Sequence, residues 1–243
     1  MNPILVVLAY SAVSAAAAAL GAGPFLFRTA LPIRQIGWAN AAASGVMLGA
    51  AYVLLIAGLP TGALAVAGGA ALGIAFVALT HSASGTDDLD LNRLDDTTPA
   101  YGYQVLFVNT LHSAWEGVAI GAAMALGLPF GIFMALAIAI HNIPEATILC
   151  AILTGRHVGV GSAAGLAVAT NVSQVLLAVG TFAIVDAAPA MLPWSAGFAV
   201  GALIQLVMAE LLPQSYHQAG HRSIALVAVL AMGIVIFLRT VAA

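Results

Sequence analysis

Long apolar stretches separated by short breaks cover almost the whole chain. A helix that crosses a lipid bilayer needs about 20 consecutive, mostly apolar residues. On that rule, the pattern predicts eight membrane-spanning helices, at residues 4–23, 38–59, 61–80, 101–127, 129–154, 158–185, 190–213 and 222–241. Residues that interrupt helices stand in the gaps, among them Pro24, Pro60, Pro129, Pro189 and Gly220. We therefore expect an all-α integral membrane protein with a single membrane domain over residues 1–243.

The composition supports the same fold class. The 243 residues are 63% hydrophobic and only 6% charged, with a mean hydropathy of +1.09, whereas a soluble domain carries about 25% charged residues. Lysine is absent, and the six basic residues are all arginines. A nucleic-acid partner is excluded because such a partner requires a clustered basic surface.

The arginines also predict an orientation. Positively charged residues concentrate in cytoplasmic loops. If the N-terminus lies outside, the loops that carry five of the six arginines face the cytoplasm, and only Arg239 faces outward. We expect both termini outside and a location in the cell (inner) membrane. The only long polar segment, residues 81–100 with five aspartates, becomes a cytoplasmic acidic loop between the third and fourth helices.

Two matching pairs of ionisable residues stand within the fourth and fifth predicted helices. His112 and Glu116 form one pair, and His141 and Glu145 form the other. Residues four apart lie one above the other on a single helix face. Ionisable groups inside a membrane are costly and mark functional sites. One such residue alone could equally tie two helices together, but two matching pairs favour a functional site.

The short connection at Leu128 and Pro129 makes the two helices antiparallel neighbours. His112 lies 16 residues before this turn and His141 lies 12 after it, so at a rise of 1.5 Å per residue the pairs reach comparable depths. Two imidazoles and two carboxylates can then converge on one ion. Such mixed nitrogen and oxygen ligands suit zinc and other first-row divalent ions, whereas magnesium and calcium prefer oxygen alone.

Other polar residues are less specific. Ser113 and Asn142 follow the two histidines and could add neutral oxygen ligands, and the Met47 thioether could join a soft metal site or simply pack. Glu210 lies near the cytoplasmic end of its helix, where it is either a ligand or a solvated carboxylate. His81, at the start of the acidic loop, is either part of a solvated spacer or a weak metal-collecting residue.

These residues resemble the ZIP (Zrt- and Irt-like) family of metal transporters. The resemblance lies in His112-Ser113-x-x-Glu116-Gly117 and His141-Asn142-x-Pro144-Glu145, and it extends to residues 44–48 and 210–213. It implies a 3+2+3 arrangement, in which two inverted three-helix repeats flank a central helix pair. It also implies transport of zinc, iron, manganese or cadmium toward the cytoplasm.

The resemblance further implies a ligand set. A first ion would be held by Met47, His112, Glu116, His141 and Glu145. A second ion would be held by Ser113, Asn142 and the same two glutamates. Since neither Ser113 nor Asn142 is charged, the sequence favours the first ion over the second.

The expected function is therefore transport of a divalent metal ion, with zinc foremost, by a protein that is not an enzyme. The ion is cargo, and no catalytic cofactor is expected. The partners are divalent ions and the lipid bilayer, with a homodimer as the assembly to consider. Two alternatives remain: an intramembrane zinc hydrolase, for which the His-Glu-x-x-His motif is missing, and a proton-coupled carrier of an organic solute, with the histidines as proton relays.

Overall fold

The computed structural model describes residues 2–86 and 98–241, and every element within these two ranges is a helix. The chain starts with α1 (Pro3–Ala17), which continues into the 3-10 helix η1 (Ala18–Leu26). The other elements are α2 (Ile33–Ser84), α3 (Pro99–Leu126), α4 (Leu128–Gly155), α5 (Val160–Thr170), α6 (Val172–Ala187), η2 (Pro189–Met191), α7 (Leu192–Leu206), η3 (Val207–Leu211), α8 (Leu212–Ala219) and α9 (His221–Val241).

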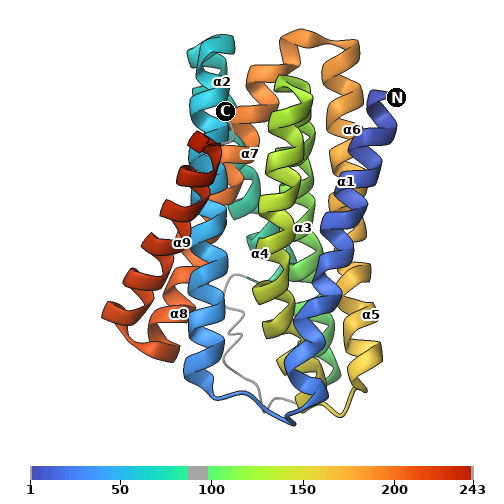
Figure 1. The fold of residues 1–243 in the computed structure, drawn as a ribbon, viewed down its shortest axis with the longest axis vertical. Helices are drawn as coiled ribbons and strands as arrows, with labels where there is room; N and C mark the ends of the chain where they lie inside the picture. Colours follow the sequence, from blue (N-terminus) through green and yellow to red (C-terminus); the bar gives the residue numbers. More distant parts are fainter. Residues whose placement is uncertain (1, 87–97, 242–243) are drawn as a thin grey trace.

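Helix α2 folds back on itself. Its 52 residues would measure about 78 Å as one straight helix. Gly62 interrupts it with a φ of 153° and a ψ of 85°, shortly after Pro60, and Figure 1 shows the ribbon turning back at this point. Glycine suits the position because it has no Cβ to clash at positive φ. The predicted spans 38–59 and 61–80 are thus the two arms of one hairpin.

Three predicted elements differ from the observed ones at their ends or interiors. The predicted span 158–185 is divided at Asn171 into α5 and α6, and the span 190–213 contains the π-helical turn η3 before it continues as α8. The predicted loop 81–100 is shorter, because α2 continues to Ser84, where Gly85 (φ 65°) caps it, and α3 begins at Pro99. The five aspartates of that loop lie outside the described residues.

Six helices in the described part of the chain are long and apolar enough to cross a membrane: 3–26, 33–84, 128–155, 160–187, 189–219 and 221–241. Helix α2 with its two arms counts once in this set, and α3 is not included in it. The protein is therefore an all-helical membrane protein. The expected eight spans in a 3+2+3 arrangement remain a prediction.

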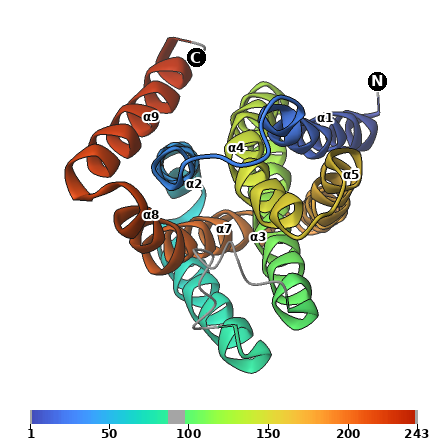
Figure 2. The same cartoon turned by 90° about the horizontal axis from the view of Figure 1, so that it is seen from below.

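Helices α3 and α4 lie in the middle of the bundle. Viewed from below, α1, α5 and α6 lie on one side of this pair, and α2, α7, α8 and α9 lie on the other (Figure 2). Small residues permit close packing on both sides. A Cβ on Gly117 of α3 would lie 2.3 Å from the Gln174 carbonyl oxygen of α6, and one on Gly197 of α7 would lie 2.1 Å from the Val66 carbonyl oxygen of α2. The first residues of α1 and the last of α9 lie at the same end of the bundle (Figure 1).

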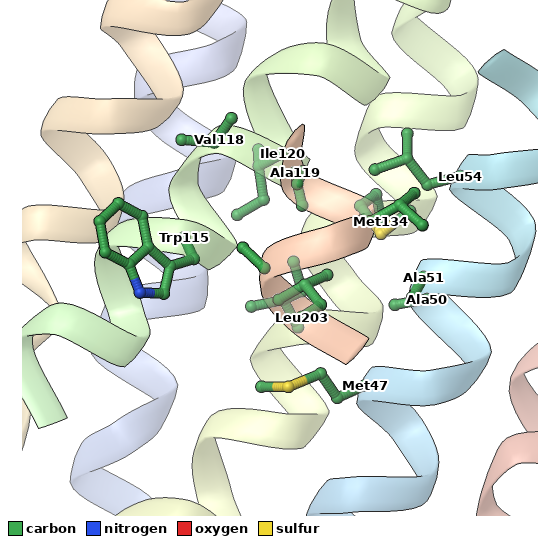
Figure 3. Packing of buried hydrophobic residues seen from close by; sticks show 14 of the residues in the cluster. Met47, Ala50, Ala51, Leu54, Trp115, Val118, Ala119, Ile120, Met134 and Leu203 are labelled. Carbon is green, nitrogen blue, oxygen red and sulfur yellow. The ribbon is translucent and has the colours of Figure 1, made fainter. Parts of the chain in front are cut away.

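Two apolar clusters fill the interior at different levels. Along α4, one cluster takes residues from Phe130 to Ile138, and the other takes residues from Ala146 to Leu153. Figure 3 shows part of the first cluster, with the Met47 side chain pointing inward from α2 beside Leu203 of α7. The segment between the two clusters carries His141 and Glu145. Polar side chains therefore occupy a layer between two apolar layers.

Candidate metal centre

The first ligand group consists of Glu116 from α3 and His141 and Glu145 from α4. His141 Nε2 lies 3.0 Å from Glu116 Oε1 and 3.5 Å from Glu145 Oε2. The three residues are 1%, 1% and 6% exposed, and one ligand atom from each lies within 4.8 Å of the others. This spacing would allow all three side chains to bind one ion.

The antiparallel packing of α3 and α4 explains which residues meet. The helices join at Gly127, whose extended backbone connects Leu126 directly to Leu128. Counting away from this turn, Glu116 comes level with His141, and His112 comes level with Glu145. The structure accordingly places His112 Nδ1 3.7 Å from Glu145 Oε1. The two pairs predicted from the sequence thus meet crosswise rather than as separate pairs.

A backbone hydrogen bond orients His141 for metal binding. Its Nδ1 lies 2.9 Å from the carbonyl oxygen of Ala43 in α2. A carbonyl oxygen can only accept, so Nδ1 carries the proton and Nε2 keeps its lone pair toward Glu116 and Glu145. Metal-binding histidines are commonly held in this way by a partner on the second ring nitrogen.

The first ligand group holds polar atoms with no hydrogen-bond partner. Among the described residues, both carboxylate oxygens of Glu116, His141 Nε2 and Glu145 Oε1 have none. Burying polar and charged groups in this state is costly, and a bound cation offsets the cost. The local environment therefore favours a positively charged occupant.

A second ligand group consists of His81, His112 and Glu210. Glu210 accepts contacts from both histidines: Oε1 lies 3.2 Å from His81 Nε2, and Oε2 lies 3.2 Å from His112 Nε2. The two histidines are buried, and the Glu210 side chain is 21% exposed. One ligand atom from each residue again lies within 4.8 Å of the others.

The second ligand group combines residues that the sequence analysis left as alternatives. His81 belongs to the last turns of α2 rather than to a solvated loop, and its Nδ1 lies 3.1 Å from Thr86 Oγ1. Glu210 stands in the π-helical turn η3. Proximity of Pro213 to a carboxylate was the available sequence signal, since π-helical turns often occur at functional sites, but it did not reveal the partner histidines.

His112 contacts both ligand groups. Its Nδ1 approaches Glu145 of the first group, and its Nε2 approaches Glu210 of the second. A continuous series of imidazoles and carboxylates therefore connects Glu116 with His81. An adjoining cavity of about 20 Å³ has room for about one water molecule and touches His112 and Glu145. Its other lining residues are mainly apolar: Val105, Val108, Ile148, Leu149, Ile152 and Leu211.

Ser113 and Asn142 are fully buried beside the two groups but bond to neighbouring helices. The Ser113 hydroxyl donates to Asn171 Oδ1 over 3.1 Å, and Asn142 Nδ2 donates to the Ser14 carbonyl oxygen and to Gln174 Oε1, each over 2.9 Å. These bonds tie α3 and α4 to α1 and α6. Among the described residues Asn142 Oδ1 has no hydrogen-bond partner.

Met47 lies in the first apolar cluster and is 3% exposed. Figure 3 shows its sulfur among apolar side chains of the bundle interior. The structure thus gives Met47 a packing role, and metal coordination by its sulfur remains a prediction.

Comparison with known proteins gives consistent matches. The family model described as "ZIP Zinc transporter" matches residues 77–239, a range that includes all six histidines and glutamates of the two ligand groups. A protein of Arabidopsis thaliana, named as a candidate zinc transporter, is 34% identical over 218 residues, which make up 87% of this chain and 35% of that protein. Zinc transporter GufA of Myxococcus xanthus is 27% identical over 164 residues, which make up 66% of this chain and 64% of that protein. This chain thus spans about a third of the first relative and somewhat under two thirds of the second.

Proposed function

Because this chain belongs to the ZIP zinc transporter family, we propose that it moves divalent metal ions across the membrane toward the cytoplasm. Zinc is the first candidate, followed by iron, manganese and cadmium. The observation that supports this most is the continuous buried series of three imidazoles and three carboxylates within membrane helices. Imidazole and carboxylate ligands bind these metals well, and their geometry decides among the metals.

The two ligand groups would act in succession. Glu116, His141 and Glu145 would bind the ion first. His112, which reaches both Glu145 and Glu210, would pass it to the second group, where the half-buried Glu210 is closest to solvent. No group offers more than three charged or imidazole ligands, and this limits affinity so that the ion can leave.

The remaining predicted ligands belong to the same proposal in a lesser role. Met47 would complete the first ion's coordination, and Ser113 with Asn142 would serve a second ion between the two glutamates. The existing hydrogen bonds of Ser113 and of Asn142 Nδ2 would have to be exchanged for that second ion, and only Asn142 Oδ1 is free of a hydrogen bond among the described residues. We therefore propose one ion in the first group.

The proposal includes the arrangement in the membrane. Residues 1–243 would form one transport domain with eight spans, 3+2+3, counting both arms of α2 and the central helix α3. Both termini would face outside in the cell (inner) membrane, and a homodimer is the assembly to test. Members of this family are described as transporters, and we propose no enzymatic activity for this chain.

Uptake of zinc into proteoliposomes tests the function. The variant H141A/E145A removes one imidazole and one carboxylate from the first ligand group. The matched control D186A/H217A removes the same two chemical groups from exposed positions. We expect saturable zinc uptake by the native protein and by the control, and uptake at the level of empty liposomes by H141A/E145A.

The outcomes separate the alternatives. Uptake that survives in H141A/E145A would show that the ion takes another route. If the folded native protein transports none of zinc, iron, manganese and cadmium, the transporter proposal fails. Transport of an organic solute that persists under metal chelation would favour a proton-coupled carrier.

A further inference from the structure

The π-helical turn η3 gives Glu210 its position. In this turn the Leu212 N–H donates to the carbonyl oxygen of Val207, five residues earlier, instead of four as in an α-helix. Pro213 follows and supplies no N–H at all. The helix is therefore widened and locally short of hydrogen bonds at the segment that carries Glu210, so its geometry depends on contacts with other elements.

Asn40 of α2 supplies such a contact. Its Nδ2 donates to the carbonyl oxygen of Leu211, the last residue of η3, over 3.1 Å. The assignment of the amide is secure in chemical terms, because a carbonyl oxygen accepts only from the nitrogen end of an asparagine side chain. The same carbonyl also accepts from Ser215 Oγ, which is a local bond within the helix.

The burial of Asn40 requires an explanation. The residue is 1% exposed, and its Oδ1 has no hydrogen-bond partner in the described part of the chain. A buried amide with one end unpaired destabilises the fold relative to an apolar side chain of the same size. Asn40 is thus a poor choice for packing alone, and its one side-chain hydrogen bond leads to the turn that carries a predicted ligand.

The same part of α2 also reaches the first ligand group. Ala43, three residues after Asn40 and hence on a neighbouring part of the same face, accepts the hydrogen bond from His141 Nδ1. One helical turn of α2 therefore contacts η3 through a side chain and α4 through a carbonyl oxygen. This segment can set the distance between Glu210 and the histidines it faces.

We propose that Asn40 is a positioning residue that holds η3 so that Glu210 reaches His81 and His112 and completes the second ligand group. This inference rests on the proposed function, because it gives that group a role in metal binding. Asn40 itself touches no ion. Its effect is transmitted through the backbone of Leu211, one residue from Glu210.

Cobalt(II) binding by the purified full chain tests the proposal. In an E116A/H141A background the first group keeps one of its three ligands, so visible absorption of Co²⁺ reports the second group. Into this background we would introduce N40L, E210Q, or both. S215A is the matched control, because it removes the other side-chain donor to the same carbonyl but leaves the contact between α2 and η3.

We expect N40L to weaken Co²⁺ binding about tenfold, as is typical for the loss of a residue that orients a ligand, and S215A to leave it nearly unchanged. In the E210Q background N40L should have no further effect, since the group that Asn40 positions is already impaired. The melting temperature of N40L without metal should equal or exceed that of its parent, because a buried unpaired amide oxygen is removed.

Three results would overturn the proposal. In the first, N40L binds Co²⁺ as tightly as its parent. In the second, N40L lowers affinity equally with and without E210Q, or lowers the melting temperature, which would indicate a general structural role. In the third, E210Q has no effect on Co²⁺ binding, which would remove the second group as a ligand set. Zinc uptake by the otherwise native chain, measured separately, shows whether the transport function also fails.

Discussion

At the scale of single residues, the first ligand group trades stability for binding. Glu116 is 1% exposed, and neither of its oxygens has a hydrogen-bond partner among the described residues. A carboxylate in such a place destabilises the metal-free protein. Natural proteins break the rules of local stability mainly at functional sites. Glu116 therefore marks the position where an ion contributes most.

This leads to a prediction for E116Q, which keeps the side chain's shape but removes its charge. Zinc at 100 times its dissociation constant stabilises a protein by about 2.7 kcal/mol, which for a chain of this size raises the melting temperature by roughly 5–10 °C. We expect that rise in the native protein and little of it in E116Q. Without metal, E116Q should melt at the same temperature as the native protein or higher.

Melting in detergent with zinc or with a chelator measures both effects. D186N is the matched control, since it also neutralises one carboxylate but at an exposed position, and it should keep the zinc-induced rise. A full rise in E116Q would show that Glu116 does not bind the ion. A large loss of stability in metal-free E116Q would show that its charge has a structural partner.

At the scale of helices, sequence patterns predicted the first ligand group better than the second. Glu116, His141 and Glu145 stand on two helices joined by a short turn, so spacing alone indicates that they meet. Glu210 and His81 depend on two features without a periodic signal: the π-helical turn η3, and the continuation of α2 past His81 to Ser84. Their contact is set by tertiary packing between α2, α3 and η3.

Close helix packing at glycine supports a second prediction. A Cβ on Gly197 of α7 would lie 2.1 Å from the Val66 carbonyl oxygen of α2, whereas one on Gly180 of α6 would have no heavy atom within 4 Å. Both glycines lie within helices. We expect G197A to destabilise the fold by about 1–3 kcal/mol through overpacking, and G180A to stabilise it by up to about 1 kcal/mol through helix propensity.

Thermal unfolding of the two variants in the same detergent gives the comparison. Because α2 packs on α7 along this contact, G197A should also broaden or lower the elution peak of the folded protein in size-exclusion chromatography. Equal melting temperatures for G197A and G180A would contradict the close approach of α2 and α7.

At the scale of the whole molecule, the apolar and polar parts are arranged as lipid requires. Many large apolar side chains of α9 are exposed, Phe237 and Val229 among them, each by about two thirds, while the carboxylates of the first ligand group are buried. The start of α1, the end of α9 and the turn between α6 and α7 lie at one end of the bundle, and the turn between α4 and α5 lies at the other (Figure 1). The fold therefore fixes which segments share a side, and charge distribution predicts which side that is.

The arginine pattern places the α4–α5 turn, with Arg156, in the cytoplasm. Single cysteines test this in a C150A background, which lacks the only native cysteine. A188C, beside η2, and G159C, before α5, are both at exposed positions. With a membrane-impermeant maleimide, we expect A188C to react in intact cells and G159C to react only after the membrane is permeabilised. Reaction of G159C alone in intact cells would reverse the orientation and with it the proposed direction of transport, because Glu210 would then lead outward. Reaction of both would mean that the two ends of the bundle are not separated by a membrane.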